Sequence, residues 1–339
     1  PLLTMGLISR ETASGSIKLA YSSPVTSGQI VLGKYLAAIG FGCCLMLVPI
    51  ASAIYGSLVI PSFDWAPVLV ALLGLYLLIC AYCAIGLFMS SLTTYQVVAA
   101  VGTLIILAIL NFVGKIGQEY DFIRELTYWL SINGRTIDML NGVIRSEDVI
   151  YFAVVVAMFL SLAILRLNST RQYAPKSVTW GKYLGVIAGT CMIGYITSRP
   201  MMMCFYDATE TKRMTLTPKS QEIMNQLEDG ITITTYVNYL DRNAYLGIPK
   251  MVNNDKQRFK QYLRFKPDIK MKYVYYYDTV TNNPWLMNRY PGKTIKEIAE
   301  EEAEKKGWNL KQLLTPEQIK KIIDLEPEGN VFVRLIERK

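Results

Sequence analysis

The residues of this chain that could do chemistry do not combine into a reactive site. The sequence of 339 residues contains no histidine, which excludes His-dependent triads, HExxH metalloproteases and Cys/His zinc sites. Cys80 and Cys83 have the spacing of a redox pair, but a reactive thiolate must be accessible, and both residues lie inside a long apolar run. We therefore expect these cysteines to pack as small hydrophobic residues.

Three further patterns could indicate a functional site: the first is rejected, and a structural role is favoured for the other two. Pro291–Thr294 reads PGKT, like the end of a phosphate-binding loop, but the position five residues before Gly292 is Met287, where the loop needs glycine. Asp278 ends a predicted strand, where a turn or a cap is favoured over a catalytic carboxylate. Three alternating tyrosines could bind sugar or peptide, although packing on a helix is favoured: Tyr273, Tyr275 and Tyr277. The sequence thus predicts a non-catalytic chain without a cofactor or metal.

The charged residues divide the chain into two parts. Residues 1–203 contain 20 charged side chains, whereas the shorter segment 204–339 contains 42. The first density is typical of a membrane domain and the second of a water-soluble one. The net charge is +4 in each part, so the excess of basic residues does not form one nucleic-acid patch. We expect a domain boundary near residue 203 and no nucleic-acid partner.

The apolar runs of the first part predict about five transmembrane helices. A helix needs about 20 apolar residues to cross a bilayer. Residues 35–63 carry no charge and suffice for one crossing, and residues 65–114 suffice for two, with a polar turn at 90–96. Residues 149–165 give a fourth span and residues 183–198 a shorter fifth. The fold class is a polytopic α-helical membrane domain.

Basic residues predict the orientation of these spans, because Lys and Arg concentrate on the cytoplasmic side. They precede the first span and follow the fourth: Arg10, Lys18 and Lys34, then Arg166, Arg171, Lys176 and Lys182. Alternation then places 1–34, 91–96 and 166–182 inside, and 60–66, 115–148 and everything after 203 outside. In the outer loop 115–148, amphipathic spacing from Phe122 to Leu130 predicts a helix that lies in the interface or packs on the ends of the spans.

The second part predicts an α/β domain with a largely parallel sheet. Strand patterns at 231–237 and 270–277 follow helical patterns at 217–227 and 251–264, and alternation along the first strand indicates half burial. A Glu- and Lys-rich helix follows at 297–306, and a last strand runs to residue 338. The chain begins without Met and ends just after this strand, so we interpret both ends as truncations.

The polar segment before the first span resembles the cytoplasmic segment of type-2 ABC exporter permeases. The resemblance rests on an acidic residue and small residues, then Ser-Pro and Gly-Lys, at Glu11, Gly15, Ser16, Pro24, Gly33 and Lys34. Residues 140–152 are similar to the family's approach to its sixth span. The resemblance implies that residues 9–34 contact a separate ABC ATPase, that two spans precede this chain, and that permeases pair as a homodimer or heterodimer in the inner membrane.

The segment after the fifth span is similar to a run found in gliding-motility auxiliary subunits of Bacteroidetes, here carried by Asp207, Thr209, Lys212 and Arg213. Together the two resemblances imply an ABC export permease fused to a periplasmic auxiliary domain. The alternatives are a membrane scaffold or sensor that recruits a partner without transport, and a secondary transporter, which the lack of charges within the spans disfavours. The predicted domains are 1–34 for coupling, 35–167 for the permease, 168–203 for a basic linker and additional span, and 204–339 for the auxiliary domain.

Overall fold

The computed structural model describes residues 1–118, 120–171, 175–197, 204–226, 230–266, 268–306 and 313–338. The chain forms two compact units, which are described separately. The helical unit comprises residues 1–116 and 125–215, and the mixed unit comprises residues 117–124 and 216–339. The unit boundary therefore follows Thr215, whereas the charge pattern suggested a boundary near 203.

The helical unit begins with two short helices, α1 (Ser9–Ser14) and α2 (Ile17–Ser22), followed by the long helix α3 (Ser27–Val59). Helix α3 starts eight residues before the uncharged run at Tyr35, because Thr26 and Gln29 cap each other's backbone amides. Next come α4 (Trp65–Leu92), α5 (Gln96–Phe112) and a 3₁₀ turn, η1 (Val113–Lys115). The break between α4 and α5 falls inside the predicted turn.

The rest of the helical unit contains α6 (Asp121–Leu130, which begins in the mixed unit), α7 (Asn133–Leu140), β1 (Val143–Arg145), α8 (Ser146–Arg171), α9 (Lys176–Thr197) and β2 (Phe205–Asp207). Helix α6 packs through Trp129, whose ring makes an edge contact with Tyr151 of α8 at 5.7 Å. That contact favours packing on the spans for this end of the predicted amphipathic helix.

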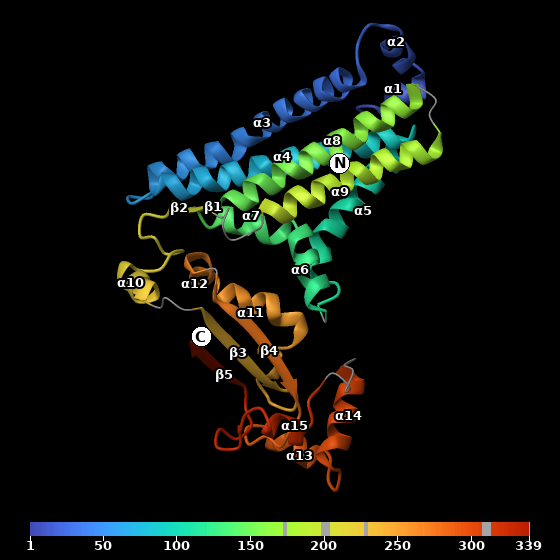
Figure 1. Cartoon of the computed structure of the whole chain (residues 1–339). Coiled ribbons are helices and arrows are strands. Elements are labelled where there is room, and N and C mark those ends of the chain that lie inside the picture. The colour runs from blue at the N-terminus through green and yellow to red at the C-terminus, as the bar shows by residue number, and fades with distance from the viewer. Residues whose placement is uncertain are drawn as a thin grey trace. The chain divides into compact units, whose positions relative to one another are not determined.

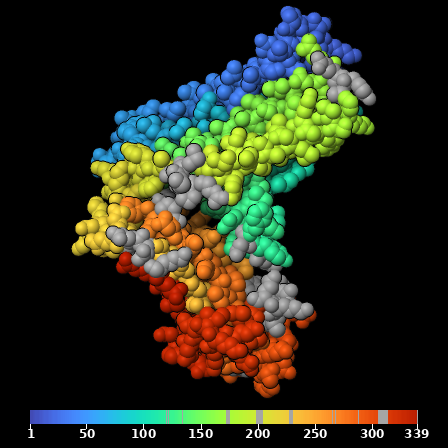
Figure 2. Space-filling view, viewed as in Figure 1, coloured from blue at the N-terminus to red at the C-terminus, as the bar shows by residue number. Residues whose placement is uncertain are grey.

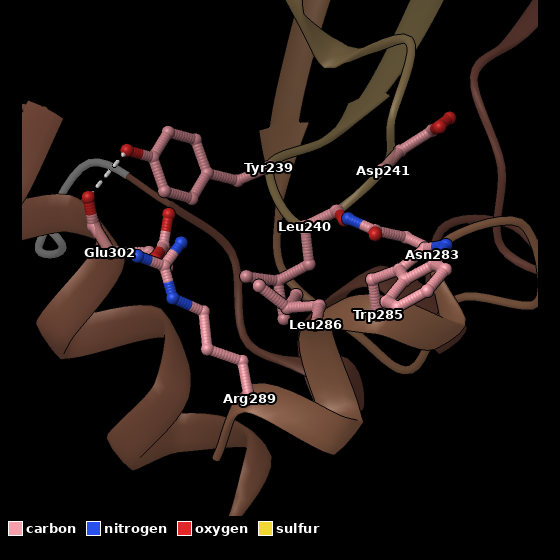
Figure 3. Close-up of a pocket in the computed structure, with 8 residues that line it drawn as sticks. All are labelled: Tyr239, Leu240, Asp241, Asn283, Trp285, Leu286, Arg289 and Glu302. Carbon is pink, nitrogen blue, oxygen red and sulfur yellow. Dashed lines mark hydrogen bonds between the residues drawn. The ribbon is translucent and has the colours of Figure 1, made fainter.

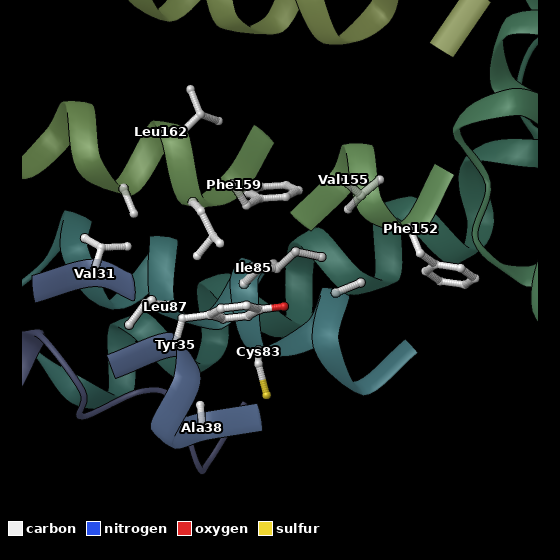
Figure 4. Close-up of a cluster of buried hydrophobic side chains, with 14 of the residues drawn as sticks. Val31, Tyr35, Ala38, Cys83, Ile85, Leu87, Phe152, Val155, Phe159 and Leu162 are labelled. Atoms are coloured by element: carbon white, nitrogen blue, oxygen red, sulfur yellow. The ribbon is translucent and has the colours of Figure 1, made fainter. Parts of the chain in front are cut away.

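The core of the helical unit lies between α3, α4 and α8, which run side by side (Figure 1). Figure 4 shows Tyr35 of α3, Ile85 of α4 and Phe159 of α8 directed into this layer. Cys83 is buried in the same cluster, and all six cysteines are free thiols. The Cys80–Cys83 pair therefore packs within a helix, as its apolar surroundings predicted.

Four helices of the described residues are long and apolar enough to cross a membrane: Ser27–Val59, Trp65–Leu92, Gln96–Lys115 and Ser146–Arg171. They confirm the first four predicted spans. The fifth predicted span corresponds to α9, a 22-residue helix that is not among these four. Its sequence is interrupted by Lys182 and by several glycines, which lower its hydropathy.

The second segment of the mixed unit begins with α10 (Pro218–Gln226) and β3 (Ile231–Asn238), followed by the 3₁₀ turns η3 (Ala244–Leu246) and η4 (Pro249–Met251). Helices α11 (Val252–Arg258) and α12 (Lys260–Phe265) lead to β4 (Lys270–Tyr276). Helices α13 (Pro284–Arg289), α14 (Ile295–Lys306) and α15 (Pro316–Lys320) precede the last strand, β5 (Val333–Arg338). Each element predicted for this part is present with slightly different ends.

The sheet of the mixed unit has the order β4-β3-β5, in which β3 pairs parallel to β4 and antiparallel to β5. The prediction of a largely parallel sheet is therefore wrong for one of its two pairings. The prediction that β3 is half buried is also wrong, since all eight of its residues are buried. Its central position between two strands, with side chains covered on both faces, removes the solvent face that its alternating pattern suggested.

Candidate coupling site

The first residues of the chain are bound to the C-terminal end of α4. The Ser90 hydroxyl accepts hydrogen bonds from the amides of Ile8 and Ser9, each at 3.0 Å, and donates one to the Met5 carbonyl at 2.9 Å. Ser9 and Ser90 are both fully buried. One hydroxyl thus satisfies the first amides of α1 and fixes this helix on α4. Sequence reasoning did not single out Ser90, because the two partners are about 80 positions apart.

Glu11 joins α1 to α3. Its Oε1 lies 2.5 Å from the Lys34 ammonium, and the two side chains are partly exposed. The sequence placed both residues in the coupling segment. The structure pairs them, which ties the segment to the start of the first span.

Gly15 forms the turn between α1 and α2. Its φ of 76° is in the left-handed region, which glycine adopts without the steric cost of a side chain. The Ser16 hydroxyl approaches Ser14 Oγ at 2.9 Å. These residues form the turn, so Gly15 and Ser16 determine the direction in which α2 leaves α1.

Helix α2 presents an apolar side chain at the surface of the helical unit. Leu19 is 75% exposed, while Ile17 on the opposite side is buried. Pro24 is exposed after α2, and its predecessor Ser23 is extended, as the residue before proline prefers. Gly33 lies inside α3, not at a turn, and a Cβ there would meet nothing within 4 Å. Leu19 is therefore the better contact candidate, and Gly33 has no structural requirement for glycine.

The end of α8 holds the connection between α2 and α3. The Arg171 guanidinium donates to the carbonyls of Tyr21 and Val25, both at 2.9 Å, and lies 5.9 Å from the centre of the Tyr21 ring. In the space-filling view, the blue α1–α2 segment lies at the same end of the helical unit as the end of α8 (Figure 2). The segment 9–34 is thus tied to α3, α4 and α8 together.

Segments that the charge pattern placed on one side share one end of the helical unit. Residues 1–34, the α4–α5 turn and the end of α8 meet through Ser90 and Arg171. At the other end, Asp64 Oδ2 accepts from the amide of Glu210 at 2.9 Å, and β1 pairs with β2. This grouping agrees with the predicted alternation of the segments.

The predicted auxiliary motif lies in the helical unit, at the end opposite α1. Asp207 Oδ1 accepts from the amide and the hydroxyl of Thr209, at 3.0 and 2.6 Å, and Oδ2 accepts from the Met214 amide at 3.0 Å. The Lys212 ammonium donates to the Asp207 carbonyl. Arg213 donates through its amide to Thr209 Oγ1 at 3.1 Å. The four motif residues therefore build one tight turn.

This turn stabilises the negative charge of the Asp207 carboxylate. Burial raises the pKa of its carboxyl, but the hydrogen bonds from Thr209 and Met214 outweigh burial, so the pKa lies below its ordinary value of 3.8. Lys212 has a φ of 48°, which is rare for a residue with a side chain. The turn follows β2, which pairs with β1 from Val143↔Asp207 to Arg145↔Phe205. Its chemistry is structural: it fastens the chain after β2 to the helical unit.

A buried ion-pair network lies beside β1, where α8 begins. Arg145 contacts Asp138 at 2.9 Å and Asp148 at 2.8 Å, and Arg135 contacts Glu147 at 3.1 Å and Asp148 at 3.2 Å. Asp148 is fully buried. The network joins α7, β1 and the first turn of α8.

The three candidate patterns of the mixed unit make structural contacts. Thr294 of the PGKT run caps α14, its amide and hydroxyl donating to Glu297 Oε2 at 2.7 and 2.9 Å. Asp278 Oδ1 accepts from the Thr279 amide at 2.7 Å, as a turn residue does. The Tyr273 hydroxyl donates to Asp255 of α11 at 2.8 Å, as the packing interpretation expects. The described residues contain no group of three or more His, Cys, Asp and Glu side chains that could hold a metal ion.

Comparison with known proteins gives one match. No curated protein and no solved structure matches the chain. Residues 2–120 match the family described as ABC-2 family transporter protein. The match covers α1 to η1, which contain the candidate coupling site and three of the four helices that could span a membrane. Residues 2–120 are thus similar to an ABC-2 transporter domain, a membrane component of ABC transport systems, and the four long apolar helices support a multi-pass membrane protein.

Proposed function

We propose that this chain is the permease subunit of an ABC export system and that residues 9–34 receive force from a separate ATPase. The family of residues 2–120 is a membrane transport component whose ATPase is normally a separate subunit. Closure of the ATPase pushes on α2, and the push reaches the spans through fixed contacts. Glu11 transmits it to α3, Ser90 to α4 and Arg171 to α8.

The observation that carries this proposal is the attachment of one exposed segment to three long helices. A segment that only recruited a partner would need one anchor, whereas Glu11, Ser90 and Arg171 provide three. Leu19 stands 75% exposed on the opposite side of α2 from the buried Ile17. One exposed leucine on a short helix suits a pocket on a protein partner.

We propose further that the end carrying residues 1–34 faces the cytoplasm, that α9 makes a fifth crossing, and that the mixed unit is periplasmic. The basic residues around the first span and after the fourth support this orientation. The run at Asp207–Arg213 supports an auxiliary subunit of the gliding-motility type, and permeases of this kind would assemble in pairs in the inner membrane.

The orientation is tested with single cysteines introduced at Lys18 and Glu304, both exposed, in a Cys204→Ser background. Intact spheroplasts are treated with a membrane-impermeant maleimide. We expect labelling at position 304 and none at position 18 until the membrane is permeabilised. Labelling at position 18 in intact cells, or protection of position 304, would overturn the orientation.

Coupling is tested by reconstituting the chain with a co-expressed ABC ATPase of the same host in nanodiscs. Substitution of Glu11 by Gln, Gly15 by Val or Ser16 by Val is expected to reduce the stimulation of ATP hydrolysis. Lys219→Gln on α10, an exposed site of the mixed unit, serves as the matched control. Unchanged binding and stimulation in all three variants would refute the coupling assignment. ATPase binding without stimulation in the unmodified protein would indicate a recruiting scaffold instead.

A further inference from the structure

A small pocket opens in the mixed unit next to the carboxyl end of β3. It has a volume of about 220 Å³ and is lined by Tyr239, Leu240, Asp241, Asn283, Trp285, Leu286, Arg289 and Glu302. Tyr239 directly follows β3, while Trp285 and Arg289 come from α13 and Glu302 from α14. Ligands of α/β folds commonly bind where strands end. The volume is below the usual range of about 300–1,000 Å³ for drug-sized ligands, so it suits one ring.

The wall of the pocket is fixed by buried contacts. The Tyr239 hydroxyl donates to the Glu302 carbonyl at 3.0 Å, and the Tyr290 hydroxyl donates to Glu302 Oε1 at 2.7 Å. Burial and, as the smaller effect, the negative charge of Glu302 raise the pKa of Tyr239 to about 12, so its hydroxyl stays protonated. Asn283 donates to the Leu240 carbonyl at 3.0 Å. The side chains that would face a ligand are therefore preorganised.

Trp285 is the unusual member of the lining. It is 81% exposed, although burial of an indole is strongly favourable. Figure 3 shows its ring at the edge of the pocket beside Asn283, with the guanidinium of Arg289 directed toward Glu302 across the opening. The pocket therefore combines a flat aromatic surface with an amide, a cation and two carboxylates.

These groups select a neutral polyhydroxylated ring. The C–H face of a pyranose is apolar and weakly positive, so it stacks on the electron-rich face of an indole. Its hydroxyls both donate and accept, which matches the carboxylate of Glu302, the guanidinium of Arg289 and the amide of Asn283. Because the lining holds two carboxylates, Asp241 and Glu302, and one cation, Arg289, the pocket has no excess positive charge to attract an anion. We infer that the Trp285 pocket binds one pyranose ring of a neutral oligosaccharide.

The test measures binding of defined hexasaccharides to the full chain in nanodiscs by titration calorimetry. The probes are maltohexaose, mannohexaose and chitohexaose, with hexagalacturonate as an anionic comparator. We expect at least one neutral probe to bind and Trp285→Ala to weaken it by about tenfold, the upper range for loss of an aromatic contact. Trp285→Phe should retain part of the affinity. Tyr245→Ala, which removes an exposed aromatic outside the pocket lining, should leave binding unchanged.

Three results would overturn the inference: no binding of any neutral probe, equal binding by Trp285→Ala, or binding of hexagalacturonate alone. Trp285 is exposed, so its loss should not unfold the domain, and a melting curve of each variant checks this. The experiment needs no ATPase. Its failure therefore leaves the coupling proposal standing, and the failure of coupling leaves this site standing.

Discussion

The Lys34 ammonium lies 2.5 Å from the Glu11 carboxylate, and this pair connects the short helix α1 to the first long helix, α3. The two residues are 23 positions apart, on either side of the turn at Gly15 and of helix α2. The pair therefore closes a loop that contains all of α2. A force applied to α2 can reach α3 through this pair and α8 through the Arg171 contacts.

Breaking the Glu11–Lys34 pair should uncouple the chain more than it destabilises it. Both side chains are partly exposed, and exposed ion pairs contribute only about 0.2–1 kcal/mol to stability. Glu11→Gln and Lys34→Gln should each reduce stimulation of the ATPase with little change in melting temperature. The exchanged double variant Glu11→Lys/Lys34→Glu should recover part of the stimulation. Equal loss in the single and exchanged variants would show that the pair itself does not transmit force.

Docking of the N-terminus on α4 should depend on Gly86. A Cβ at this position would collide with the side chain of Thr4, which is itself buried. Overpacking of this kind costs about 1–3 kcal/mol, so Gly86→Ala should lower the melting temperature and expose residues 1–14 to protease. Gly86→Ala combined with Thr4→Gly should restore protection. Gly185→Ala on α9, where a Cβ meets nothing within 4 Å, is the control.

The Asp207 turn should weaken only in acid. The pKa of Asp207 is depressed on folding, so its contribution to stability is present above its ordinary pKa of 3.8 and is lost as the pH falls through the lower folded value. The wild-type protein should therefore have a higher melting temperature than the Asp207→Asn variant at pH 5 to 7. The difference should shrink below about pH 4. A difference that grows in acid would contradict the assigned direction of the pKa.

Loss of Arg145 from the ion-pair network at the start of α8 should destabilise the helical unit. Its guanidinium faces three carboxylates, those of Asp138, Glu147 and Asp148. Removing one partner of a buried network costs about 3–5 kcal/mol, because the remaining charges stay buried. Arg145→Met should lower the unfolding temperature of the helical unit. Arg242→Met, at an exposed arginine, should not. An unchanged unfolding temperature for Arg145→Met would contradict this prediction and would mean that water reaches the network.

The long helices were predictable from the sequence because a bilayer imposes a length and an apolar composition that a local pattern records. The start of α3 was not predicted, because the uncharged run marks only the part of the helix that crosses the membrane. The first residue of the helix is determined by the cap at Thr26. The sheet was less predictable. The full burial of β3 and the antiparallel pairing of β5 depend on neighbours that the strand sequences do not specify.

The candidate site was predicted in part. The segment, Glu11, Gly15 and Lys34 follow from local composition and resemblance, but their mutual contacts do not. Ser90 and Arg171 were beyond sequence reasoning as contacts, because each meets the segment from a helix distant in the chain. For Arg171 the sequence contained one indication, because this residue is one of the basic residues predicted to lie on the same side of the membrane as residues 1–34.

The most direct test of the central claim is photo-crosslinking between α2 and the ATPase. A benzophenone amino acid is placed at Leu19 or, as a matched exposed apolar site of the mixed unit, at Ile223. The coupling proposal predicts an ATPase crosslink from position 19 whose yield changes with bound nucleotide, and none from position 223. A crosslink from position 223 alone, or none from position 19 in a complex that hydrolyses ATP, would contradict the proposal that residues 9–34 receive force from the ATPase.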